Sequence, residues 1–165
     1  MKLIKTFIAS LLAIVMISAP VSGESMLKEI LSSGVLKAGT TGDFFPFSKR
    51  DTATNDYVGY DIDILKELAK DMEVDIEFVA TDWKTLVNGI VAGKYYITGS
   101  ASIKAGRMKA AGYSDPYTAV VTKPYTTEDK VGQFDGWDSI NQSSVHVATT
   151  LGTSFEHQVE SWFPN

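Results

Sequence analysis

Residues 59–98 read GYDIDILKELAKDMEVDIEFVATDWKTLVNGIVAGKYYIT, and this stretch decides the fold class of the chain. Apolar residues at helical spacing follow Asp61, which is a suitable helix N-cap. Residues 75–80 alternate in polarity as a strand does. Thr81-Asp82 then opens a second helix, whose apolar stripe ends before Gly93, and residues 95–98 form another strand pattern. The alternation of helices and strands predicts an α/β fold with a mostly parallel sheet.

The same rhythm extends toward the N-terminus. A short helix is expected over residues 26–33 and a strand over 35–39, followed by a loop over 40–55 that is rich in Gly, Asp, Thr and aromatic residues. Ligands of parallel sheets gather at the carboxyl ends of the strands. The segment after the first strand, Trp83 and residues 99–107 all lie just past such ends, so we expect them to meet at one edge of the sheet.

The loop GSASIKAGR, residues 99–107, has the composition of a carboxylate-binding site. Ser100 and Ser102 supply hydroxyl donors, and the guanidinium of Arg107 can grip both oxygens of a carboxylate. A polar loop with a solvated arginine is the alternative interpretation of this segment.

A second unit is expected to begin after Tyr117. Residues 145–149 form a strand pattern, and Thr153 and Glu156 have the spacing of a capping box, which predicts a helix start. A helix N-terminus after a glycine favours an anion. Plain helix capping, with no ligand, remains the alternative.

Composition limits the function classes. The chain has 165 residues, 44% of them hydrophobic and 21% charged, with no cysteine and a net charge of −5. These values are typical of one globular domain or slightly more, and they exclude disulfide and thiolate chemistry. The acidic balance argues against nucleic acid as a partner. With only two histidines, His146 and His157, no metal or other cofactor is expected.

The N-terminus has the pattern of a secretory signal peptide. Lys2 and Lys5 precede an apolar run over residues 7–17, and small residues lead to a cleavage site after Gly23. A retained membrane anchor is the alternative, but the run is short for a span. We therefore expect residues 1–23 to be removed and the chain to be exported to the periplasm, with no membrane insertion afterwards.

Six ordered segments resemble the family 3 periplasmic solute-binding proteins, which bind amino acids for ABC importers. The matching segments are GTTGDFFPF (39–47), GYDIDI (59–64), DWKTL (82–86), GSASIKAGR (99–107), YSDPY (113–117) and LGT (151–153).

The resemblance implies a type II periplasmic-binding-protein fold, in which two α/β lobes close on a ligand. The first lobe would span residues 24–117, residues 118–122 would be a crossing segment, and residues 123–165 would begin the second lobe. The sequence resembles a truncated family member with an incomplete second lobe, so we expect marginal stability. The usual aspartate before the hydroxyl loop is replaced by Tyr95-Tyr96, and Lys104-Ala105-Gly106 departs from the usual Thr-Pro-Glu.

The resemblance also implies roles for individual residues. An aromatic pair would sandwich the side chain of the ligand, three residues of the first lobe would hold its α-carboxylate, and two residues of the second lobe would close on it. In that order they are Phe44 and Trp83; Ser100, Ser102 and Arg107; Thr153 and Ser154.

The function so implied is capture of a small amino acid or related carboxylate, without cofactor, and its delivery to an ABC permease in the inner membrane. The alternative is a cyclohexadienyl dehydratase, acting on prephenate or arogenate, on the same scaffold. The runs GTTGD (39–43) and PFS (46–48), with Trp83, resemble that enzyme. Its general acid would be a glutamate beyond Asn165, and Asp43 is interpreted here as a turn former. A signalling or adhesion module has little support.

Overall fold

The computed structural model describes residues 23–165. The predicted signal peptide therefore lies outside the described residues, apart from Gly23, with which helix α1 (Gly23–Ser33) begins. None of the helices in the described part has both the length and the apolar character that a membrane crossing requires.

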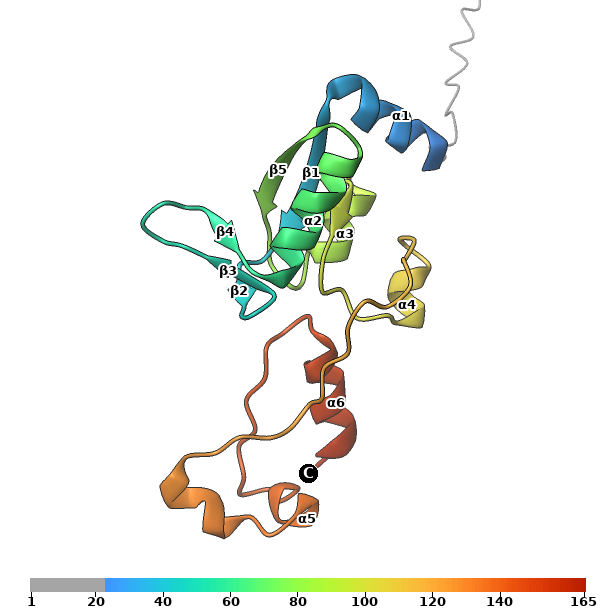
Figure 1. The fold of residues 1–165 in the computed structure, drawn as a ribbon. Helices are drawn as coiled ribbons and strands as arrows, with labels where there is room; N and C mark the ends of the chain where they lie inside the picture. The colour runs from blue at the N-terminus through green and yellow to red at the C-terminus, as the bar shows by residue number, and fades with distance from the viewer. Residues whose placement is uncertain (1–22) are drawn as a thin grey trace, which may run out of the picture.

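A three-stranded parallel sheet forms the centre of the first part of the chain (Figure 1). Strand β1 (Val35–Thr40) lies in the middle, and it pairs in parallel with β5 (Asp75–Ala80) on one side and with β6 (Ile97–Thr98) on the other. Helices α2 (Tyr60–Asp71) and α3 (Leu86–Val91) provide the crossover connections. The predicted α/β alternation and the parallel sheet are confirmed.

Tyr95 has the largest fully buried side chain in this part of the chain. The ring of Tyr95 is 1% exposed and fills space that side chains at Gly39 and Gly89 would otherwise occupy. Its hydroxyl donates to the carbonyl oxygen of Leu86 at 2.6 Å. The tyrosine at the position where the resemblance implied an aspartate is therefore a core residue, and the two glycines that face it make room for the ring.

A small antiparallel sheet occupies much of the segment for which the sequence predicted a loop. Its strands are β2 (Asp43–Phe44), β3 (Ser48–Arg50) and β4 (Tyr57–Val58), in that order. They project to one side of the parallel sheet in Figure 1. These strands have two or three residues each, too few to show an alternating pattern in the sequence.

Two helices begin at other residues than the sequence predicted. Helix α2 starts at Tyr60 with Gly59 as its N-cap, so Asp61 is not the cap but a buried residue of the first turn. Helix α3 starts at Leu86, because the carboxylate of Asp82 accepts the N–H of Thr85 at 2.9 Å and closes a separate turn first.

The rest of the chain has little regular structure. It contains α4 (Ala105–Met108), the 3₁₀ helix η1 (Glu128–Gln133), α5 (Trp137–Ile140) and α6 (Ser154–Trp162). The predicted strand over residues 145–149 is wrong. Its residues alternate between half-buried and exposed, as in a strand, but they pair with no other strand of the described residues. An extended segment without a ladder partner is not a strand.

Candidate functional site

All seven residues that the sequence singled out line one cleft. The cleft lies between the carboxyl ends of β1 and β6 and the loop that leads into α6, whose N-terminal end is directed toward the parallel sheet (Figure 1). The residues are Phe44, Trp83, Ser100, Ser102, Arg107, Thr153 and Ser154. Four stretches of the chain, far apart in sequence, therefore meet at this cleft.

Aromatic rings form one wall of the cleft. The rings of Phe44 and Trp83 meet edge to face with centroids 5.5 Å apart, and Phe47 stacks on Phe44 at 5.0 Å. The ring of Phe155 in α6 belongs to the same cluster, with its centroid 6.5 Å from that of Phe44. The indole N–H of Trp83 donates to Asp43 Oδ1 at 2.9 Å, which fixes the plane of the indole ring. Phe155 was not among the predicted residues, since only the tertiary structure brings α6 to this wall.

Hydroxyl and guanidinium groups form the polar side of the cleft. The hydroxyl oxygens of Ser102 and Ser154 lie 3.0 Å apart, across the cleft. Arg107 donates to the carbonyl oxygen of Gly152 at 3.0 Å and to that of Ser102 at 3.4 Å. The guanidinium thus already bridges the two sides of the cleft through backbone carbonyls, which are neutral acceptors that a carboxylate could replace.

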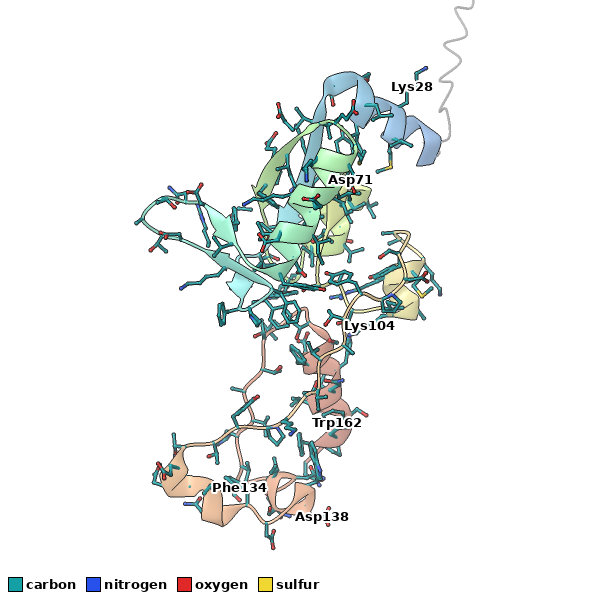
Figure 2. All side chains as sticks on the ribbon, viewed as in Figure 1. Lys28, Asp71, Lys104, Phe134, Asp138 and Trp162 are labelled. Carbon is teal, nitrogen blue, oxygen red and sulfur yellow. The ribbon has the colours of Figure 1, made fainter. Side chains whose placement is uncertain are left out.

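Lys104 is a second cation on this side, and the sequence had shown it only as a departure from the family pattern. Its ammonium group donates to the carbonyl oxygen of Thr153 at 3.4 Å, and Figure 2 shows its place where the two parts of the chain meet. Loss of solvent around the ammonium and the nearby charge of Arg107 lower the pKa of Lys104, while Glu156 opposes this change.

The N-terminus of α6 is capped by its own side chains, as the spacing predicted. Thr153 Oγ1 accepts the N–H of Glu156 at 3.4 Å and donates to the carbonyl oxygen of Thr150 at 2.7 Å. The carboxylate of Glu156 accepts the N–H of Gly152 at 2.8 Å. Because its hydroxyl proton is already donated, Thr153 acts in this structure as a cap of the helix.

Gly152 brings this loop against the first part of the chain. A Cβ atom added at Gly152 would lie 2.8 Å from the Cα of Lys84, the residue that follows Trp83. Gly152 also has a positive φ of 80°, a conformation that favours glycine. The glycine therefore permits the close approach of the α6 loop to the aromatic wall.

Asp61 and Tyr117 surround Ser100, and neither was predicted to belong to the site. Ser100 Oγ donates to Asp61 Oδ2 at 2.5 Å, and the hydroxyl of Tyr117 donates to Asp61 Oδ1 at 2.8 Å. The same tyrosine oxygen accepts the N–H of Ser100 at 3.0 Å. Burial, with a contribution from Asp61, raises the pKa of Tyr117 to about 12. Both residues stand in segments that carry the family resemblance, but nothing in their spacing indicates a mutual contact.

In the part of the chain that the structure describes, no group of three or more His, Cys, Asp or Glu side chains is arranged to hold a metal ion.

Comparisons with known proteins agree with this geometry. Residues 36–130 match the bacterial extracellular solute-binding proteins, family 3. The cyclohexadienyl dehydratase of Pseudomonas aeruginosa is 34% identical over 134 residues, which are 81% of this chain and 50% of that protein. The lysine/arginine/ornithine-binding periplasmic protein of Escherichia coli is 34% identical over 112 residues, which are 67% of this chain and 41% of that protein.

A solved structure shows a similar fold. The ancestral amino acid-binding protein AncCDT-1, a precursor of cyclohexadienyl dehydratase, superposes with a TM-score of 0.79 at 34% identity. The match covers 85% of this chain and 62% of that one. The chain thus spans about half the length, or less, of these two curated relatives.

Proposed function

This chain belongs to the bacterial extracellular solute-binding proteins of family 3, and we propose that it captures a small amino acid or a related carboxylate by closing two lobes around the cleft. The observation that carries the proposal is the Ser102–Ser154 pair, with Arg107 beside it. It places two hydroxyl donors and a guanidinium at one spot, although they come from segments about 50 residues apart, and this spot adjoins an aromatic wall.

The mechanism follows from these groups. A ligand carboxylate would displace the carbonyl of Gly152 from Arg107 and accept hydrogen bonds from Ser102 and Ser154. Hydrogen bonds to an ionised carboxylate are stronger than the one to a neutral carbonyl and the one between two hydroxyl groups that they would replace. The rings of Phe44 and Trp83 would cover the ligand side chain, since flat aromatic surfaces bind apolar and cationic groups with little loss of conformational entropy.

Closure requires two lobes joined by a crossing segment, and we propose the same lobe boundaries that the sequence analysis predicted. Residues 24–117 form the first lobe, residues 118–122 cross between the lobes, and residues 123–165 belong to the second. After export and signal cleavage near Gly23, the protein would work in the periplasm and present its ligand to an ABC permease. Release would follow opening of the lobes at the membrane.

Ligand-induced stabilisation tests this function. The purified chain is heated with each amino acid in turn, and binding raises the melting temperature because ligand stabilises only the folded state. We expect a rise for one or a few amino acids, and Arg107→Ala should weaken the binding roughly tenfold or more. Lys109→Ala is the matched control, because it removes an equal charge from an exposed residue outside the cleft. A protein that no amino acid stabilises, or an Arg107→Ala variant that binds as the wild type does, would overturn the proposal.

A second candidate is dehydration of prephenate or arogenate. It is favoured by the 34% identity to the Pseudomonas aeruginosa cyclohexadienyl dehydratase, which extends over 81% of this chain. The same arginine and hydroxyl groups would hold a substrate carboxylate. Incubation of the purified chain with each compound distinguishes the two functions: formation of phenylpyruvate or phenylalanine, lost in Arg107→Ala, would establish the enzyme.

A further inference from the structure

We propose that Asp61 is a positioning residue that holds two segments in place. Through Ser100 it holds the loop proposed to bind a carboxylate (residues 99–107), and through Tyr117 it holds the start of the crossing segment (residues 118–122). The inference rests on the proposed function only where it concerns ligand affinity. Its structural basis is a closed ring of three hydrogen bonds, from Ser100 Oγ and Tyr117 Oη to the two carboxylate oxygens and from the Ser100 N–H back to Tyr117 Oη. The ring joins the first turn of α2, the loop after β6 and the segment before residue 118.

The burial of Asp61 makes these hydrogen bonds necessary. Asp61 is only 4% exposed, and a buried carboxylate is destabilising unless it is hydrogen-bonded. No ion pair of Asp61 exists among residues 23–165, so the two hydroxyl donors carry that role, together with the favourable end of the α2 dipole. Rotation of either donor away from Asp61 would leave a buried oxygen without its partner, so both donors are held firmly.

The backbone at Ser100 shows what this anchor achieves. Ser100 has a φ of 53°, in the left-handed region that side-chain-bearing residues seldom adopt. Both its side chain and its N–H are bound within the ring, which holds it in this conformation. At Gly99 an added Cβ atom would lie 2.6 Å from Asp61 Oδ2, so the carboxylate lies directly against the loop backbone. The turn so formed leads to Ser102, and thereby sets where its hydroxyl faces Ser154.

The hydrogen bond between Tyr117 and Asp61 also limits which residues of the crossing segment can move. Tyr117 ties the start of this segment to Asp61, and at its other end Thr122 Oγ1 donates to Gln158 Oε1 of α6 at 2.9 Å. Residues 118–121 are exposed, and they make no hydrogen bond to any described residue. Movement between the two parts of the chain is therefore concentrated in these four residues, and it does not extend back into the carboxylate-binding loop.

Amide hydrogen exchange of Ser100, followed by NMR in the full chain, tests the anchor without any ligand. Asp61 does not accept this N–H itself, and it can protect the amide only by holding Tyr117 Oη and Ser100 Oγ in place. In Asp61→Asn we expect Ser100 to exchange roughly tenfold faster or more, while the central amides of α2 stay as protected as in the wild type. Asp63→Asn is the matched control, because it removes an equal charge from an exposed position in the same helical turn.

A milder pair of variants keeps the test decisive if Asp61→Asn does not fold. Tyr117→Phe removes only the tyrosine hydroxyl group and keeps the aromatic side chain. It should accelerate exchange at Ser100 as well. Tyr125→Phe, at a tyrosine that is 93% exposed, should not. Equal Ser100 exchange in Tyr117→Phe and Tyr125→Phe, or in Asp61→Asn and Asp63→Asn, would overturn the inference.

Ligand affinity provides the second readout. For an amino acid that stabilises the wild type, we expect Asp61→Asn to bind roughly tenfold more weakly at temperatures where it is fully folded. Unchanged affinity in a variant with fast Ser100 exchange would refute the positioning role and leave the proposed function intact. If no amino acid binds the wild type, the proposed function fails, and the exchange comparison still decides whether Asp61 holds the loop.

Discussion

Ser102 and Ser154 are 52 positions apart in the chain, and their hydroxyl oxygens lie 3.0 Å from each other. This is a direct side-chain contact between the loop after β6 and the first residue of α6. It places the hydroxyl groups that would bind a carboxylate on opposite sides of one gap. The polar half of the cleft is thus assembled by contacts between the two parts of the chain before any ligand arrives.

A double-mutant cycle measures this contact. Ser102→Ala and Ser154→Ala each remove one hydroxyl, and their effects on the free energy of unfolding in urea should fall short of additivity by about 0.5–1 kcal/mol, because either change alone breaks the same hydrogen bond. Ser102→Ala combined with Ser143→Ala should be additive, since Ser143 is exposed and does not line the cleft. Additivity in both pairs would mean that the contact is absent in solution.

Replacement of Gly152 should separate backbone strain from steric exclusion. Gly152→Ala and Gly34→Ala both place a side chain at a positive φ, 80° and 71°, at a cost of about 1–2 kcal/mol. An added Cβ meets the backbone of Lys84 only at Gly152, whereas nothing lies within 4 Å of it at Gly34. We expect Gly152→Ala alone to weaken ligand-induced stabilisation in the thermal assay. Equal losses in the two variants would contradict the role given to Gly152 in closing the cleft.

The glycines that face Tyr95 should tolerate no side chain. An added Cβ would lie 2.4 Å from the Tyr95 ring at Gly39 and 2.1 Å from its hydroxyl oxygen at Gly89. We expect each change to alanine to lower the free energy of unfolding by about 1–3 kcal/mol, measured in urea, because the core would be overpacked. Gly106→Ala, with no atom within 4 Å, serves as the control and should be neutral or slightly stabilising.

Tyr117 should ionise at a higher pH than an ordinary tyrosine does. Its folded pKa of about 12 exceeds the ordinary value of 10.0, so the folded state retains a proton that the unfolded state has lost. The contribution of Tyr117 to the free energy of unfolding is therefore complete below pH 10, and it disappears as the pH rises from about 10 toward 12. Ultraviolet titration of the phenolate should show this late step, and Tyr117→Phe should remove it. A wild-type titration without a late step would contradict the hydrogen-bonded ring around Asp61.

Much of the fold could be predicted from the sequence. The strand predicted over residues 75–80 has the same bounds as β5, and the Thr153–Glu156 spacing predicted the start of α6. Both patterns are local, because a half-buried strand alternates and a helix needs its first N–H groups capped. The seven predicted site residues also line one cleft. The five in the first part of the chain do so because the carboxyl ends of parallel strands share an edge.

What the sequence missed depends on contacts between distant segments. Residues 145–149 have the pattern of a strand, but a strand exists only where a neighbour completes its hydrogen bonds. Asp61 had the sequence context of a helix cap, and only the packing of α2 against the loop after β6 gives it Ser100 and Tyr117 as partners. Local pattern thus determined the elements of the parallel sheet and the residues that are proposed to bind a carboxylate. Tertiary structure decided which of those residues face the cleft and which are held by buried hydrogen bonds, because a buried polar group must find its partners wherever the fold places them.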